Sequence, residues 1–297
     1  MPWFLTEIAQ FCTPMDSIYS IQKMRSLVHE ERRKNHSIGF VPTMGALHEG
    51  HLSLVKKAKE ENDICVVSVF VNPLQFNNKE DFNKYPVQFE KDIELLKNSG
   101  CDFLFMPEVA EFYPSEPKLS IQMGLLDTIL EGLHRPGHFS GVAVVVSKLF
   151  NVIHPDKAYF GQKDLQQVAV INQLVRELNF PIEIISCPIM REANGLAMSS
   201  RNMRLSEQGK VLAANLYKAL CQMEKQIKSG ETNVEIIQQS GLQLLTSFPE
   251  IRVEYLEVVN GETLESVKDL NSISKTAICI AAFVEGVRLI DNLVIIS

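Results

Sequence analysis

The fold prediction for this chain depends on one stretch, Ile38-Gly39-Phe40-Val41-Pro42-Thr43-Met44-Gly45-Ala46-Leu47-His48-Glu49-Gly50-His51. It begins as an apolar strand and continues into a tight turn that carries two glycines and two histidines. An amphipathic helix at residues 52–62 and a second apolar strand at residues 64–72 follow. This order predicts one unit of a parallel α/β sheet, in which the strand-to-helix turn aims backbone N–H groups at an anion, above all a phosphate.

Strands and helices alternate on both sides of that unit, up to about residue 188. We expect helices at residues 18–33, 86–98, 124–132, 141–152 and 164–178, and strands at residues 101–106, 157–160 and 182–187. The alternation predicts right-handed crossovers and therefore a doubly wound, Rossmann-like parallel sheet. The polar loop at residues 72–86 is long, which is typical of a mobile or binding segment.

The pattern changes after residue 190. Ser206 is placed to cap a long helix with Leu212, Leu216, Leu220, Met223 and Ile227 along one side and Gly230 past its end. A second helix is expected at residues 234–247, and strands at residues 252–259, 276–283 and 287–296. We therefore predict a Rossmann-like domain at residues 1–189 that binds the ligands, and a smaller C-terminal α+β lid domain at residues 190–297.

Composition excludes several classes of protein. The chain has 297 residues, of which 45% are hydrophobic, so a packed core is expected. The net charge of −7 argues against a broad nucleic-acid surface, because phosphate backbones need clustered Lys and Arg. Six cysteines without a C-x-x-C pair favour reduced cytoplasmic thiols over disulfides or zinc. We see no signal peptide, and no apolar run approaches the ~18 residues that a membrane helix needs.

The two histidines of the turn are the first candidate site. His48 and His51 are three residues apart at the start of a helix, so they share a face and can both donate hydrogen bonds to phosphate oxygens. Gly45 and Gly50 let the chain approach a ligand closely. The alternatives are solvent-facing or capping histidines, or a metal pair. A metal pair is disfavoured because the pattern is not His-Glu-x-x-His and no third ligand is obvious.

Two further segments could hold phosphates. Lys163 supplies a compact cation at a second strand-to-helix turn, and Asp164 beside it could hold a ribose hydroxyl or only cap the helix. The run Met198-Ser199-Ser200-Arg201-Asn202, preceded by Arg191, combines hydroxyls with a guanidinium and could clamp a polyphosphate. A surface charge and a capping loop between domains are the structural alternatives.

Three more features are weaker on their own. Asn72-Pro73-Leu74-Gln75-Phe76 follows a strand, where amides suit a small polar substrate, although Asn-Pro is also an ordinary turn. Arg135 stands in a glycine-bearing loop and could meet an anion. Asp92 lies on an amphipathic helix, where most carboxylates are solvated. No Walker A and no G-x-G-x-x-G pattern is present. A nucleotide site would therefore be of the His-x-x-His kind.

Taken together, these motifs resemble one family closely. Residues 42–51 are similar to the signature of the pantoate–β-alanine ligase (pantothenate synthetase) family, within the His-Ile-Gly-His nucleotidyltransferase superfamily. So are residues 70–76, 135–139, 160–167, 195–202 and Arg288-Leu289-Ile290-Asp291-Asn292. The likeness runs in the same order from about residue 20 to the C-terminus.

The resemblance implies a two-step reaction. The carboxylate of pantoate attacks the α-phosphate of ATP with magnesium, which gives pantoyl adenylate and pyrophosphate. β-Alanine then attacks the activated carbonyl, which gives pantothenate and AMP. ATP is thus a co-substrate, Mg²⁺ is the expected metal, and no organic prosthetic group is expected. The resemblance also suggests a cytoplasmic homodimer whose partners are small molecules, with no nucleic acid and no membrane.

The resemblance also assigns residues by matching position. His51 would be the usual acid, and Ser199, Ser200 and Arg201 would close over the phosphates as the equivalent of the superfamily's mobile Lys-Met-Ser-Lys-Ser segment. The implied catalytic residues are His48, His51, Lys163, Ser199, Ser200 and Arg201. The implied ATP-binding residues are Met44, Gly45, Ala46, Leu47, His48, Glu49, Gly50, His51, Gly161, Gln162, Lys163, Asp164, Met190, Met198, Ser199, Ser200 and Arg201. Gln75 and Gln167 would hold pantoate, with Asn72 and Arg135 assisting. In Glu90-Lys91-Asp92 a lysine replaces a carboxylate of some relatives, which leaves Asp92 as the candidate magnesium contact.

Other functions stay open at this point. A nucleotidyltransferase that keeps the nucleotide on its product shares His-x-x-His, but would not require the paired glutamines Gln75 and Gln167. A tRNA-charging enzyme is disfavoured because no basic anticodon-binding module is present. A non-enzymatic nucleotide sensor would bind ATP without releasing pyrophosphate when pantoate is added.

Overall fold

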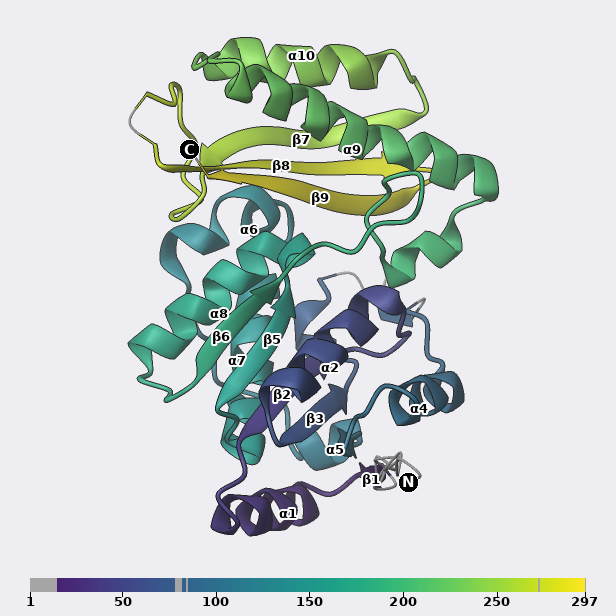
Figure 1. The fold of residues 1–297 in the computed structure, drawn as a ribbon, viewed down its shortest axis with the longest axis vertical. Coiled ribbons are helices and arrows are strands. Elements are labelled where there is room, and N and C mark those ends of the chain that lie inside the picture. The colour runs from purple at the N-terminus through teal and green to yellow at the C-terminus, as the bar shows by residue number, and fades with distance from the viewer. Residues whose placement is uncertain (1–14, 78–81, 84, 272, 297) are drawn as a thin grey trace, which may run out of the picture.

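The computed structural model describes residues 15–77, 82–83, 85–271 and 273–296. The first fourteen residues lie outside this part, and they include Cys12 and the N-terminal segment in which we expected no signal peptide. Five residues of the polar 72–86 loop also lie outside it. The described chain forms a lower module around a parallel sheet and an upper module around an antiparallel sheet (Figure 1). Within it, no helix is both long and apolar enough to cross a bilayer.

The lower module contains a six-stranded sheet in which every neighbouring pair is parallel. In chain order its strands are β1 (Asp16–Ile18), β2 (Ile38–Thr43), β3 (Ile64–Val69), β4 (Phe103–Phe105), β5 (Lys157–Gly161) and β6 (Glu183–Cys187). In space the order is β1-β4-β3-β2-β5-β6. The chain therefore winds outward from β2 in both directions, which confirms the predicted doubly wound sheet. Its switch point lies between β2 and β5, where ligands of such sheets bind beyond the carboxyl ends of the strands.

Helices cover both faces of this sheet because its strands are buried on both sides. One face packs against α1 (Ile21–Arg33), α7 (His138–Ile153) and α8 (Leu165–Glu177). The other face packs against α2 (Glu49–Glu61) and α4 (Phe89–Lys97). Short elements connect them: η1 (Pro73–Gln75), α5 (Val109–Phe112), η2 (Gly124–Asp127), α6 (Leu130–His134) and η3 (Gln162–Asp164).

Two local predictions were wrong. The helix expected from residue 18 begins at Ile21, because Ile18 belongs to the edge strand β1 and pairs with Phe105. A three-residue strand carries too short a pattern to be recognised from sequence. The continuous helix expected at residues 124–132 is instead η2 followed by α6, since Leu130 adopts a φ of +44° that a continuous helix does not allow.

The upper module has the predicted α+β composition. The sheet consists of β7 (Ile251–Asn260), β8 (Lys275–Val284) and β9 (Val287–Ile296), all antiparallel. Helices α9 (Glu207–Lys228) and α10 (Val234–Thr246) lie over its upper face (Figure 1). Ser206 caps α9 by accepting a hydrogen bond from the Gly209 N–H, as the sequence predicted. A short turn of helix, η4 (Ser200–Arg204), precedes α9.

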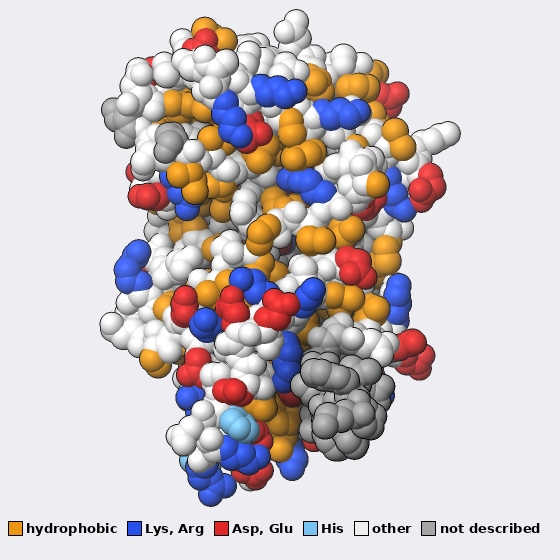
Figure 2. Space-filling view, viewed as in Figure 1, with side chains coloured by type: hydrophobic (Ala, Val, Ile, Leu, Met, Phe, Trp, Pro, Cys, Tyr) orange, Lys and Arg blue, Asp and Glu red, His pale blue; other side chains and the backbone are white. Residues whose placement is uncertain are grey.

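The two modules share one hydrophobic core. Val259, Ala277 and Cys279, on the lower face of the antiparallel sheet, pack in the same cluster as α7 and α8 of the lower module. The opposite face of that sheet forms a separate cluster with α9 and α10. The modules are therefore joined by apolar packing and not only by the connecting chain. On the face that Figure 2 presents, positive and negative side chains are interspersed, with no extended basic surface.

Candidate active site

The turn after β2 is shaped by a carboxylate from another helix. Gly45 and Ala46 have φ angles of +82° and +50°, so the chain reverses within two residues. Asp92 of α4, which is fully buried, accepts hydrogen bonds from the Ala46 and Leu47 N–H groups at 2.9 and 2.8 Å. A Cβ on Gly45 would lie 2.9 Å from Asp92 Oδ2 and 3.0 Å from a methyl of Val69, so only glycine fits there. The expectation that Asp92 is solvated was wrong.

His48 and His51 follow directly after this turn, at the start of α2. Their ring centroids are 4.1 Å apart, as their spacing predicted. His48 is the N-cap of α2, and its Nδ1 accepts a hydrogen bond from the Gly50 N–H at 3.1 Å. A neutral His48 therefore carries its proton on Nε2. His48 both caps the helix and lines a cavity, so the capping and ligand-binding alternatives are compatible.

Both imidazoles are neutral at physiological pH. Burial and the positive charge of Lys163 lower the pKa of His48 to about 4. Burial, with His48 and Lys163 nearby, lowers the pKa of His51 to about 3. His51 Nδ1 is buried and has no hydrogen-bond partner among the residues that the structure describes. Two neutral rings next to a lysine can donate to an anion without adding two buried positive charges.

The turn after β5 brings in Lys163. It lies beside the β2 turn because β2 and β5 are adjacent in the sheet. The Lys163 side chain is 16% exposed, and its Nζ lies 3.8 Å from Asp164 Oδ1. Asp164 makes no side-chain hydrogen bond that caps α8, so the capping role that we considered for its carboxylate is not observed. Asn292 of β9 contacts this turn from the upper module.

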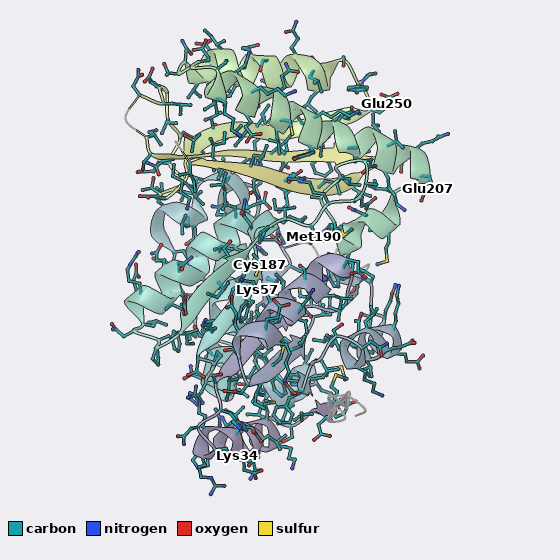
Figure 3. The ribbon with its side chains drawn as sticks, in the orientation of Figure 1. Lys34, Lys57, Cys187, Met190, Glu207 and Glu250 are labelled. Carbon is teal, nitrogen blue, oxygen red and sulfur yellow. The ribbon has the colours of Figure 1, made fainter. Side chains whose placement is uncertain are left out.

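The segment between the modules folds back as a hairpin. Arg191 and Ala197 form an isolated antiparallel bridge, and the Met198 N–H donates to the Met190 carbonyl at 2.9 Å. Figure 3 shows Met190 where the chain passes from β6 to the upper module. The hairpin delivers Ser199, whose hydroxyl accepts a hydrogen bond from the Arg201 N–H and caps η4. The open end of the hairpin also approaches α2, since a Cβ on Gly50 would lie 3.7 Å from Met198 Cβ.

Amides from η1 complete the site on the side of α7. Asn72 Nδ2 donates to Gln75 Oε1 at 3.0 Å, and Gln75 Nε2 donates to Met44 Sδ at 3.2 Å. The η1 backbone lies directly against α7, because a Cβ on Gly141 would be only 2.3 Å from the Leu74 carbonyl oxygen. Polar side chains from two turns are thereby joined around one cavity.

That cavity has a volume of about 200 Å³ and contains most of the predicted site residues. The predicted residues that line it are Met44, His48, Gly50, His51, Asn72, Gln75, Arg135, Gly161, Lys163, Asp164, Gln167, Met190, Met198, Ser199, Ser200 and Arg201. Gly45, Ala46, Leu47, Glu49, Gln162 and Asp92 do not line it. A neighbouring cavity of about 520 Å³ shares Arg135, Lys163, Asp164, Ser199 and Arg201 and extends to β9. One continuous polar region thus lies between the two modules.

Sequence reasoning missed several residues of this region. His138 is buried, lines the cavity and bonds through Nδ1 to the Gln75 carbonyl at 2.8 Å. Burial and the charge of Arg135 lower its pKa to about 3, so it too is neutral. The available sequence signal was Gly137, which directly precedes His138. In the structure Gly137 has a φ of +79° and is the N-cap of α7. Val142, Val145 and Val146 of α7 form an apolar part of the cavity wall. From sequence alone we expected only a helix at these positions.

Comparisons with known proteins give one consistent result. The family model described as pantoate-beta-alanine ligase matches residues 16–294. The pantothenate synthetase of Cytophaga hutchinsonii is 67% identical over 282 residues, which cover 95% of this chain and 100% of that protein.

Solved structures agree with the sequence relatives. A pantothenate synthetase structure from Thermus thermophilus has a TM-score of 0.89 at 43% identity, and the match covers 94% of this chain and 99% of that chain. A pantoate-beta-alanine ligase structure from Francisella tularensis, complexed with beta-gamma ATP and beta-alanine, has a TM-score of 0.77 at 37% identity, covering 94% and 97%.

Proposed function

The chain belongs to the pantoate–β-alanine ligase family and is an enzyme of that class, and we propose that it works through a pantoyl-adenylate intermediate. A pantoate carboxylate oxygen bonds to the α-phosphorus of ATP while the bond to the leaving pyrophosphate breaks. The β-alanine amine then bonds to the activated carbonyl carbon, loses a proton and expels AMP. The first step supplies the leaving group that a carboxylate lacks, so the enzyme needs no covalent nucleophile.

One observation carries this proposal: the side chains that we propose for binding the phosphates and those that we propose for binding the acid line the same cavity. His48, His51 and Lys163 line it, and so do Gln75 and Gln167. We propose that the imidazole N–H groups and the Lys163 ammonium bind the triphosphate and stabilise the charge that builds on the departing pyrophosphate. Such donors need no reorganisation during the reaction because the turns already hold them.

The acid would occupy the other side. Gln75 and Gln167 would bind the pantoate hydroxyls and carboxylate, with Asn72 and Arg135 supporting them. The valine wall of α7 would pack against the two methyl groups of pantoate. Such an arrangement directs the carboxylate toward the phosphates, which is the main way that a bound geometry accelerates a two-substrate step.

Magnesium is part of the proposal as a companion of the ATP phosphates. Mg²⁺ is commonly held by one or two carboxylates together with substrate phosphates. Within the described residues there is no group of three His, Cys, Asp or Glu side chains that could hold a metal. Both oxygens of Asp92 already accept hydrogen bonds from backbone N–H groups, so this carboxylate is not positioned as a free metal ligand. The magnesium contact of Asp92 stays a prediction.

We further propose that the segment Met198 to Arg201 closes over bound ATP as a lid carried by the C-terminal domain, with the boundary at residues 189/190. It lies at the junction of the modules, and Tyr85 approaches Ser200 there with 3.4 Å between their hydroxyl oxygens. Limited proteolysis measures closure: we expect cleavage in residues 190–204 to slow when ATP and pantoate are added together. Equal cleavage with and without ligands would count against a lid.

A homodimer in the cytoplasm, acting without nucleic acid or membrane, is proposed from the family resemblance alone. Light scattering at several protein concentrations measures the oligomeric state.

Pantoate-dependent exchange of labelled pyrophosphate into ATP, first without β-alanine, tests the reaction. We expect exchange to require pantoate, and AMP to be released only after β-alanine is added. A nucleotidyltransferase would retain the nucleotide on its product when an amine is added, and a nucleotide sensor would bind ATP without any exchange. Either result would overturn the proposal.

A further inference from the structure

The last strand of the chain touches the turn that carries Lys163. We propose that Asn292 of β9 is a positioning residue for Lys163 and thereby contributes to the step in which ATP reacts. The inference rests on the proposed function, since it assumes that Lys163 binds the triphosphate. Asn292 lies in the motif Arg288-Leu289-Ile290-Asp291-Asn292, for which no residue role was predicted from sequence.

The contacts of Asn292 converge on two consecutive peptide groups. Its Nδ2 donates to the Gln162 carbonyl at 3.0 Å and to the Lys163 carbonyl at 2.9 Å. Its Oδ1 accepts from Gln162 Nε2 at 3.4 Å. Asn292 is 2% exposed, so these bonds form away from solvent. A single side chain from the upper module therefore holds the backbone from which the Lys163 side chain departs.

Asn292 is itself fixed by its neighbour. Asp291 Oδ1 accepts the Asn292 N–H at 2.8 Å, and both Asp291 oxygens bind the Arg191 guanidinium at 2.6 and 2.9 Å. The guanidinium also stacks on the ring of Tyr217, 3.7 Å from its centroid. Bidentate pairing with a stacked guanidinium leaves little rotational freedom. The position of Asn292 is thus determined by packing within the upper module.

This arrangement links the two phosphate-binding segments. Arg191 lies in the hairpin that delivers Ser199, and its Nη1 also donates to the Gly195 carbonyl at 3.1 Å. On the other side, Asn292 holds the Lys163 turn. The Asp291–Asn292 pair therefore sets the distance between Lys163 and the Ser199 hairpin. Catalysis is sensitive to such placement, because a displacement of about 1 Å can cost on the order of a hundredfold in rate.

Loss of a buried amide could instead act only on stability, so the experiment separates the two half-reactions. We compare Asn292→Ala and Asn292→Asp with the matched control Asn215→Ala. Asn215 is also a buried asparagine of the upper module that donates to one backbone carbonyl, of Leu212. It lines neither of the two cavities described above nor the smaller one, of about 40 Å³, that both Lys163 and Asn292 line. Asn292→Asp keeps the size of the side chain but replaces its donor with a carboxylate oxygen that faces two carbonyl oxygens, so it should slow exchange at least as much as Asn292→Ala.

Two rates are measured for each variant: pantoate-dependent ATP–pyrophosphate exchange, and conversion of supplied pantoyl adenylate and β-alanine to pantothenate. We expect Asn292→Ala to slow exchange by about tenfold or more, through kcat more than through the KM for ATP, given the cost of misplacing a reacting group. The second half-reaction should change by less than about twofold, because the pyrophosphate, whose developing charge Lys163 is proposed to stabilise, has already left. Asn215→Ala should alter neither rate beyond its effect on stability, which urea unfolding measures.

A double-mutant cycle then tests whether the effect passes through Lys163. In a Lys163→Ala background, Asn292→Ala should have almost no further effect on exchange. Equal losses in both half-reactions, or a full additional loss in the Lys163→Ala background, would overturn the inference. If Lys163→Ala itself leaves exchange at the wild-type rate, the proposed site assignment fails instead, so the two failures are distinguishable.

Discussion

His51 and Lys163 are the residues on which the proposed chemistry depends most directly. Both line the cavity, and each can donate a hydrogen bond or charge to a phosphate oxygen. We expect His51→Ala and Lys163→Ala each to slow adenylate formation by about a hundredfold or more, on the order of 3 kcal/mol of transition-state stabilisation. Exchange of pyrophosphate into ATP measures the rate, and circular dichroism checks folding. Near-wild-type rates in both folded variants would defeat the assignment.

The buried neutral histidines also make stability depend on pH. In the folded chain the pKa of His48 is about 4 and those of His51 and His138 are about 3, whereas an unfolded histidine titrates near 6.5. Below pH 6.5 the unfolded state therefore binds more protons than the folded state. The stability that these residues contribute is complete above pH 6.5 and is lost as the pH falls toward their folded values.

Urea unfolding at pH 7.5, 6.5 and 5.5 measures this effect. We expect the free energy of unfolding to decrease over this range, and His138→Gln, which keeps a donor for the Gln75 carbonyl, to show a shallower decrease. Glu131 does not contribute in this window. Burial opposes its ionisation, but hydrogen bonds and charge from Arg288 hold its pKa at about 2, so its contribution changes only below about pH 4.5. A pH-independent free energy between pH 7.5 and 5.5 would contradict the buried, neutral state of these rings.

The placement of site residues was predictable from sequence only where neighbours in the chain determine it. His48 and His51 share a face because they are three residues apart on one helix, and Lys163 was found because it follows a strand. The contacts of Asp92 and Asn292 depend instead on which helix or strand packs against which turn. No local pattern records that packing. The sequence accordingly left Asp92 as a solvated or metal-binding carboxylate and gave Asn292 no role.

At the level of elements, long periodic segments were predicted well and short ones were not. The strand β2, the helix α2 and the long helix α9 follow clear patterns, with a cap residue at the start of α9. The three-residue β1 is a strand only because β4 offers it an edge to pair with. The interruption at Leu130, where φ is +44°, coincides with a tertiary contact: Gln166 of α8 donates to the Leu126 and Ile129 carbonyls and accepts the Glu131 N–H.

The contact between α4 and the β2–α2 turn leads to a prediction at this scale. Asp92→Ala would leave two buried N–H groups, of Ala46 and Leu47, without acceptors. We expect the free energy of unfolding to fall by about 2–6 kcal/mol, at roughly 1–3 kcal/mol for each unsatisfied group. Urea unfolding measures it. Asp92→Asn, which keeps one carbonyl acceptor, should lose less.

Magnesium dependence separates this role from a metal contact. If Asp92 acts mainly as an anchor of the turn, the Mg²⁺ concentration for half-maximal exchange should change little in Asp92→Asn. If it acts mainly as a magnesium contact, stability would stay at the wild-type level and the required Mg²⁺ concentration would rise.

For the whole molecule, the decisive feature is the joint between the modules. Arg288 of β9 donates to both Glu131 oxygens of α6 at 2.7 Å each, and Tyr255 of β7 donates to the same carboxylate at 2.8 Å. The apolar core continues across this joint, with Cys279 and Ala277 of β8 packed beside the helices of the lower module. The sequence predicted two modules but gave no sign that they share a core, because the lower face of a β-sheet reads the same whether it covers a helix or another domain.

A shared core predicts that the modules unfold together, and two native cysteines can report on each. Cys65 of β3 is fully buried in the lower module, and Cys279 of β8 is 6% exposed at the joint. Burial raises the pKa of both thiols to about 12, so neither should react while the protein is folded. Pulse labelling with a maleimide across a urea series, read by peptide mass spectrometry, measures each thiol separately. The partly exposed Cys221 of α9 serves as a control that the reagent is active without urea.

Because unfolding the upper module alone would expose the apolar face that α7 and α8 cover, we expect Cys65 and Cys279 to become reactive at the same urea midpoint. Labelling of Cys279 at a clearly lower urea concentration than Cys65 would mean that the upper module opens independently and that the shared cluster contributes little to its stability.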